Sequence, residues 1–164
     1  MSKLSLLCLS SWEKYLPTYK CMLWNETNFD IYSNPYVKEA YESNKYAFVT
    51  DYVRLYVLHK YGGIYMDTDV EVLKPLDTFL DLPAFSGFET TTHVPTGIIG
   101  SEKGGVWAKE MLEYYDNRHF ILPDGSMDMT SNVQIISNLM NHRSGYIPNN
   151  TYQIYNNCFH IFPK

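Results

Sequence analysis

Apolar residues recur at helical spacing in several parts of the chain. The longest such stretch begins at Tyr46 and ends at Gly62-Gly63, where glycine can adopt the left-handed conformation that closes a helix. Pro35 suits the first turn of another helix, because an N–H there would have no partner within the helix. The spacings predict helices over Leu4–Tyr15, Pro35–Asn44, Tyr46–Tyr61, Gly105–Asn117 and Ser131–Asn141.

Short apolar runs between these helices predict strands. The expected strands are Tyr19–Trp24, Ile64–Met66, Val70–Val72, Ala84–Glu89, Thr96–Gly100 and one or two within Tyr152–Phe162. Because helices and strands alternate through most of the chain, we expect an α/β sandwich. No repeat or Pro/Gly-rich linker divides the 164 residues, so we expect a single domain over residues 1–164.

Composition and charge exclude some classes of protein. Hydrophobic residues make up 45% of the chain and charged residues 19%, which is typical of a globular protein rather than a disordered one. A net charge of −5 without any run of Lys or Arg argues against binding to nucleic acid. The three cysteines lack metal-site spacing, so we expect reduced thiols and a cytoplasmic location. The apolar run near the N-terminus is too short to be a transmembrane segment.

Asp67 and Asp69 are the main candidates for chemistry. They follow the short apolar strand Ile64–Met66 directly and are separated by one residue. Two carboxylates at a strand end can hold Mg²⁺ or Mn²⁺, which takes its other ligands from water and a diphosphate. A lone Asp-X-Asp pair is a weak signal, but a preceding helix, a Gly-Gly stop and a buried strand strengthen it.

The residues around this pair resemble a known family. Phe48–Asp77, FVTDYVRLYVLHKYGGIYMDTDVEVLKPLD, is similar to the DXD-containing sugar-binding region of a glycosyltransferase family. That family includes bacterial polysaccharide enzymes, yeast-type mannosyltransferases and clostridial glucosylating toxins. Ser11–Pro17, Leu23–Glu26 and Thr96–Gly100 resemble its other segments, and the likeness is strongest to the bacterial polysaccharide members.

The resemblance implies a GT-A-like fold and a metal-dependent transferase. Such an enzyme moves a sugar from a nucleotide-diphosphate donor to a glycan or lipid-linked saccharide acceptor, with retention of configuration. The implied cofactor is Mn²⁺ or Mg²⁺, and peripheral membrane association is compatible with this class of acceptor.

The resemblance also assigns residues. Asp67 corresponds to a residue near the ribose and sugar, and Asp69 to the metal ligand. Asp51 and Arg54 correspond to sugar-contacting residues, although an ion pair that only ties the helix to the sheet is the alternative. The implied catalytic residues are Asp67, Asp69 and Arg54; the implied substrate-binding residues are Asp51, Arg54, Asp67, Thr96 and Gly97. Asn132 either starts a helix or contacts the sugar.

Two other functions stay open from the sequence. Relatives carry a strand before the segment that resembles Ser11–Pro17, and they continue past Lys164, so this chain looks shortened at both ends. A catalytically weak remnant that only binds a nucleotide sugar or a partner protein is therefore an alternative. The run YMDTDV, Tyr65–Val70, also resembles the nucleophile motif of haloacid dehalogenase-type phosphohydrolases.

Overall fold

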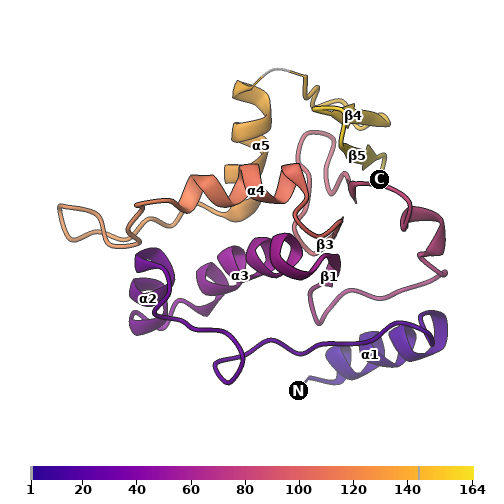
Figure 1. Cartoon of the computed structure of the whole chain (residues 1–164), viewed down its shortest axis with the longest axis horizontal. Coiled ribbons are helices and arrows are strands. Elements are labelled where there is room, and N and C mark those ends of the chain that lie inside the picture. The colour runs from indigo at the N-terminus through magenta and orange to yellow at the C-terminus, as the bar shows by residue number, and fades with distance from the viewer. Residues whose placement is uncertain (1, 144) are drawn as a thin grey trace.

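The computed structural model describes residues 2–143 and 145–164 as a mixed α/β structure (Figure 1). The elements are α1 (Lys3–Tyr15), α2 (Pro35–Glu42), α3 (Tyr46–Tyr61), β1 (Gly63–Met66), the 3₁₀ helix η1 (Asp77–Phe79), β2 (Ala84–Gly87), β3 (Ile98–Ser101), α4 (Val106–Leu112), the 3₁₀ helix η2 (Glu113–Tyr115), α5 (Asn132–His142), β4 (Gln153–Tyr155) and β5 (Phe159–Phe162). All five predicted helices are confirmed, although α4 is shorter than expected because its last turn tightens into η2.

Local chemistry explains where the helices begin and end. Asn34 caps α2 by accepting hydrogen bonds from the backbone N–H groups of Tyr36 and Val37, and Pro35 occupies the first turn. Gly62 ends α3 with a φ of 72°. A Cβ there would lie 2.7 Å from the backbone nitrogen of Lys103, so both the conformation and the space require glycine.

The five strands form one sheet in the order β1-β3-β2-β5-β4, with β2 and β5 parallel and the other neighbours antiparallel. Met66 lies opposite Ile98 in the β1–β3 pair. The same register brings Asp67, just beyond β1, beside Gly97, whose carbonyl accepts a hydrogen bond from the Asp67 N–H at 2.8 Å. The sheet therefore places the first carboxylate of the pair next to the predicted Thr96-Gly97 segment.

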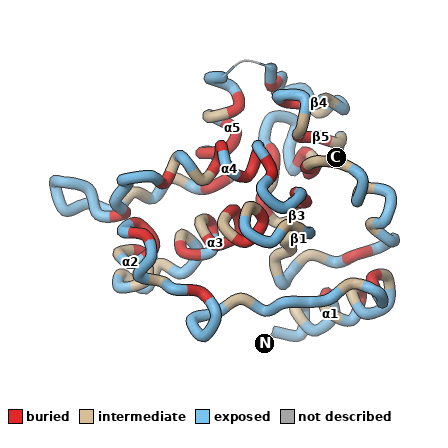
Figure 2. The backbone as a smooth tube through the Cα atoms, in the orientation of Figure 1, coloured by how far each residue is buried: buried red, intermediate tan, exposed pale blue. Residues whose placement is uncertain are grey.

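The buried core joins the sheet to the helices α2, α3, α4 and α5 (Figure 2). Trp107 of α4 stacks on Phe159 of β5, with ring centroids 4.2 Å apart, and Leu55 and Leu58 of α3 are fully buried. Helix α1 is mostly exposed and lies apart from this core in Figure 1. Burial of these large apolar side chains is the main favourable contribution to folding.

Two predicted strands are wrong. Tyr19–Trp24 and Val70–Val72 are both irregular in the structure. An apolar run forms a strand only where a neighbouring strand supplies ladder hydrogen bonds, and neither run has such a neighbour among the described residues. Leu23 is 75% exposed as a result.

Two further expectations concern cysteines and membrane spans. Cys8, Cys21 and Cys158 are all free cysteines in the structure. Among the described residues, no helix has both the length and the apolar character that crossing a bilayer requires.

Candidate active site

Asp67 is held by three elements at the end of β1. Its Oδ1 accepts a hydrogen bond of 2.7 Å from the hydroxyl of Tyr65, and its Oδ2 lies 3.6 Å from Nη1 of Arg54 on α3. Its backbone N–H bonds to the Gly97 carbonyl. These contacts restrict the carboxylate to one orientation, and Tyr65 was not singled out by the sequence.

Arg54 is almost fully buried, with 5% exposure, and connects α3 to the sheet. Its Nη2 lies 3.1 Å from Asp51 Oδ1, and its Nη1 donates a hydrogen bond of 2.6 Å to the carbonyl of Thr96. Its guanidinium also lies over the Tyr65 ring, 4.9 Å from the centroid. The predicted Asp51–Arg54 pairing on one helix face is confirmed, and the same guanidinium orients Asp67.

Asp51 is buried on the far side of this guanidinium. Burial raises the pKa of Asp51 to about 6, although the Arg54 charge and hydrogen bonds from Asn132 oppose the rise. The Asn132 amide also donates to the Asp51 carbonyl at 3.1 Å, and its Oδ1 is buried without a hydrogen-bond partner in the part of the chain that the structure describes. Asn132 is the first residue of α5, which confirms the predicted helix start. Ser131 provides the cap, and the Asn132 amide ties α5 to α3.

The carboxylate pair opens onto a surface hollow of about 390 Å³. Its lining comes from the end of β1, the segment between β2 and β3, and the start of α5: Asp67, Asp69, Val70, Glu89, Pro95, Thr96, Gly97, Ile98 and Val133. Four predicted site residues therefore meet in one place, whereas Asp51 and Arg54 lie behind the lining. Glu89 was missed; it follows β2 closely, as Asp67 follows β1, which is the signal that could have found it.

The donor set fits a hard divalent cation. Asp69 is exposed, and its carboxylate makes no hydrogen bond or ion pair with the described residues, so it is free to bind a ligand. A Cβ at Gly97 would lie 3.4 Å from Asp67 Oδ2, and the absence of a side chain there keeps this carboxylate accessible. No three His, Cys, Asp or Glu residues of the described chain cluster as a metal site, so most ligands would come from water and a diphosphate.

Comparison with known families identifies this arrangement. Residues 3–86 match the family described as the glycosyltransferase sugar-binding region containing a DXD motif. The chain belongs to this family. The matched region includes α1, α3, β1 and both aspartates, and the assignment decides against the phosphohydrolase alternative.

Curated relatives of this glycosyltransferase-family chain include two yeast proteins. It is 33% identical over 92 residues to inositol phosphoceramide mannosyltransferase 3 of Schizosaccharomyces pombe, covering 54% of this chain and 26% of that protein. It is 30% identical over 112 residues to a mannosyl phosphorylinositol ceramide synthase of Saccharomyces cerevisiae, covering 64% of this chain and 29% of that protein. The chain thus spans less than a third of the length of these relatives.

A solved structure shares the fold. The PaToxG glycosyltransferase superimposes with a TM-score of 0.60 at 16% identity, covering 87% of this chain and 64% of that chain. This likeness confirms the expected α/β, GT-A-like class. The stronger resemblance to bacterial polysaccharide enzymes stays an expectation, since the curated relatives named here are yeast proteins.

Proposed function

We propose that this chain is a metal-dependent glycosyltransferase that uses a nucleotide-diphosphate sugar. One observation carries the proposal: Asp67 and Asp69 line the same hollow as Thr96 and Gly97, directly beyond β1. Membership of the DXD family supports sugar transfer. The residues in the hollow supply oxygen ligands, and the site is open enough to admit a diphosphate.

The surroundings of each residue indicate its role in the proposed reaction. Asp69, which is exposed and unpaired, would hold Mn²⁺ or Mg²⁺, and the bound ion would stabilise negative charge on the departing diphosphate. Asp67, whose carboxylate Tyr65 and Arg54 orient, would accept hydrogen bonds from ribose or sugar hydroxyls. Thr96 and Gly97 shape the wall beside it.

In the transfer, the bond from the sugar's anomeric carbon to the diphosphate oxygen breaks, and the diphosphate leaves with the electron pair. The acceptor oxygen bonds that carbon with retention of configuration, and its proton passes to the departing diphosphate.

We propose a glycan or a lipid-linked saccharide as the acceptor. The names of the yeast relatives support this choice, because inositol phosphoceramide is a lipid carrying a sugar-like headgroup. Exposed apolar side chains on α1, namely Leu4, Leu6 and Leu7, are compatible with peripheral association with a lipid surface. Three unpaired cysteines favour a reducing, cytoplasmic setting.

The alternative function is binding without catalysis. The unpaired segment Tyr19–Trp24 exposes Met22 and Leu23, which favours contact with a partner protein. In that case the chain would bind a nucleotide sugar weakly, or bind only the partner.

Titration calorimetry with several nucleotide sugars, including GDP-mannose and UDP-glucose, tests the proposal. We expect binding that requires Mn²⁺, accompanied by slow hydrolysis of one donor. Binding of a donor without hydrolysis or transfer would favour the alternative function. If no donor binds at millimolar concentration with Mn²⁺ present, the transferase proposal is wrong.

A further inference from the structure

Two hydrogen bonds connect the loop that carries Asp69 to α1. Residues 67–76 contain no strand, and a Val70 N–H bond to the Asp67 carbonyl at 3.0 Å closes the turn around Asp69. Immediately after this turn, the Val70 carbonyl accepts a hydrogen bond of 2.8 Å from the indole Nε1 of Trp12. Two residues later, the Val72 N–H donates to Ser11 Oγ at 2.8 Å.

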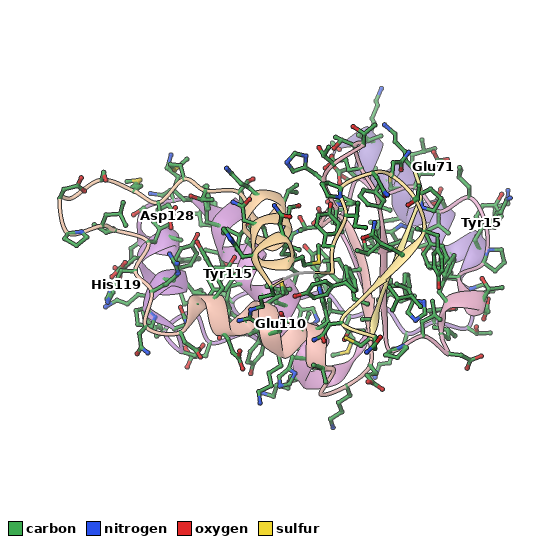
Figure 3. All side chains as sticks on the ribbon, turned by 90° about the horizontal axis from the view of Figure 1, so that it is seen from above. Tyr15, Glu71, Glu110, Tyr115, His119 and Asp128 are labelled. Carbon is green, nitrogen blue, oxygen red and sulfur yellow. The ribbon has the colours of Figure 1, made fainter. Side chains whose placement is uncertain are left out.

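Ser11 is placed to hold the loop without leaving a polar group unpaired. Its hydroxyl donates to the Cys8 carbonyl at 2.6 Å and accepts from Val72 at the same time. Ser11, Cys8 and Val72 are all buried, so water cannot replace this bond and its loss would cost more than an exposed one. Figure 3 shows Tyr15 of α1 and Glu71 of the loop at the same end of the molecule.

The Asp69 side chain is not fixed by polar contacts of its own. Its carboxylate makes no hydrogen bond or ion pair with the described residues, so its direction depends on the backbone on either side of it. The two hydrogen bonds from α1 reach the first and third residues after Asp69. A shift of this backbone would move the carboxylate relative to Asp67, which its own contacts hold in place.

We propose that Ser11 and Trp12 are positioning residues for the metal-binding carboxylate of Asp69. They act through the Val70 and Val72 peptide groups and touch neither metal nor donor. This role rests on the proposed function, because it assumes that Asp69 binds a divalent cation. Groups that orient metal ligands from behind typically change metal affinity by 10- to 100-fold when removed.

The test uses the variants Ser11→Ala and Trp12→Phe, with Ser10→Ala as the matched control. Ser10 donates to the Leu7 carbonyl at 3.0 Å in the same way as Ser11 does to Cys8, but it is exposed and makes no bond to the loop. Mn²⁺ affinity in the presence of UDP or GDP is measured by electron paramagnetic resonance. Hydrogen exchange of peptides covering residues 67–76 reports the order of the loop.

We expect Ser11→Ala and Trp12→Phe each to weaken Mn²⁺ binding roughly tenfold and to speed hydrogen exchange at residues 68–73. Ser10→Ala should change neither the Mn²⁺ affinity nor the exchange. If wild type binds Mn²⁺ and the two variants bind it equally well, the positioning role is wrong while the proposed function stands. Failure of wild type to bind Mn²⁺ with either nucleotide overturns both. Should Ser11→Ala fail to fold, Trp12→Phe, which keeps an aromatic ring but loses the indole N–H donor and part of the ring volume, decides the matter.

Discussion

Arg54 Nη1 lies 3.6 Å from Asp67 Oδ2, which links helix α3 to the strand end that carries the candidate metal site. The same guanidinium pairs with Asp51 at 3.1 Å and so lies between two carboxylates. The two interpretations of Arg54 from the sequence were a sugar contact and an ion pair joining helix to sheet. The ion pair is present, and it orients the first aspartate of the motif; the sugar contact stays a prediction.

Replacing Arg54 with Met should destabilise the fold by about 3–5 kcal/mol, because a buried carboxylate loses its counter-charge. Urea unfolding monitored by circular dichroism measures the change. Arg118→Met is the matched control, since Arg118 is half exposed and lies 4.0 Å from Asp128; its loss should cost less than about 1 kcal/mol. Equal losses in the two variants would contradict the structural role of Arg54.

The unfolding free energy should depend on pH through Asp51. Its pKa in the folded protein is about 6, against a usual 3.8, so the folded state holds the proton more tightly than the unfolded state. Asp51 therefore contributes stability below about pH 4, and this contribution is lost as the pH rises through about 6. The difference amounts to roughly 3 kcal/mol.

Asp51→Asn tests this expectation, because asparagine does not titrate. Raising the pH from 4 to 7 lowers the unfolding free energy of wild type through Asp51. The same change of pH should lower that of the variant by roughly 3 kcal/mol less. Asp81→Asn, at an exposed position, should follow the wild-type profile. A variant profile that coincides with wild type would show that burial does not raise the pKa of Asp51.

Asp69→Ala should abolish Mn²⁺-dependent donor binding and leave the fold intact. Asp69 is exposed and unpaired among the described residues, and substitutions at such positions usually change stability by less than about 0.5 kcal/mol. Thermal shift with a nucleotide sugar and Mn²⁺ provides the measurement, with Asp81→Ala as the control. Equal shifts in wild type and Asp69→Ala would count against the metal role.

Two glycines of one segment should separate binding from stability. A Cβ at Gly100 would lie 2.0 Å from the Phe85 ring across the sheet, so Gly100→Ala should cost about 1–3 kcal/mol through overpacking. A Cβ at Gly97 would be 3.4 Å from Asp67 Oδ2, at a distance the fold tolerates. Gly97→Ala should therefore weaken donor binding with little loss of unfolding free energy; the reverse pattern would show that Gly97 does not line the working site.

Local patterns in the sequence were enough to predict the five helices, the strand before the carboxylates and the α/β class. Helical spacing, the proline at the start of α2 and the glycine at the end of α3 act within a few residues, so they can be read without the fold. The Asp51–Arg54 pair was also predictable, because residues three apart share a helix face. Tyr19–Trp24 and Val70–Val72 were wrong for the complementary reason: a strand requires a neighbour that the local pattern does not reveal.

By itself, the sequence determined the family and the identity of the carboxylate pair, since both depend on residue type at fixed spacing. Only the tertiary structure decided that Arg54 lies behind Asp67, that Glu89 and Val133 share its hollow, and that Ser11 and Trp12 of α1 hold the loop beyond Asp69. The residues in these contacts are between 13 and 66 positions apart in the chain. Such contacts form when the sheet register and helix packing bring distant segments together, and no spacing in the sequence specifies that distance.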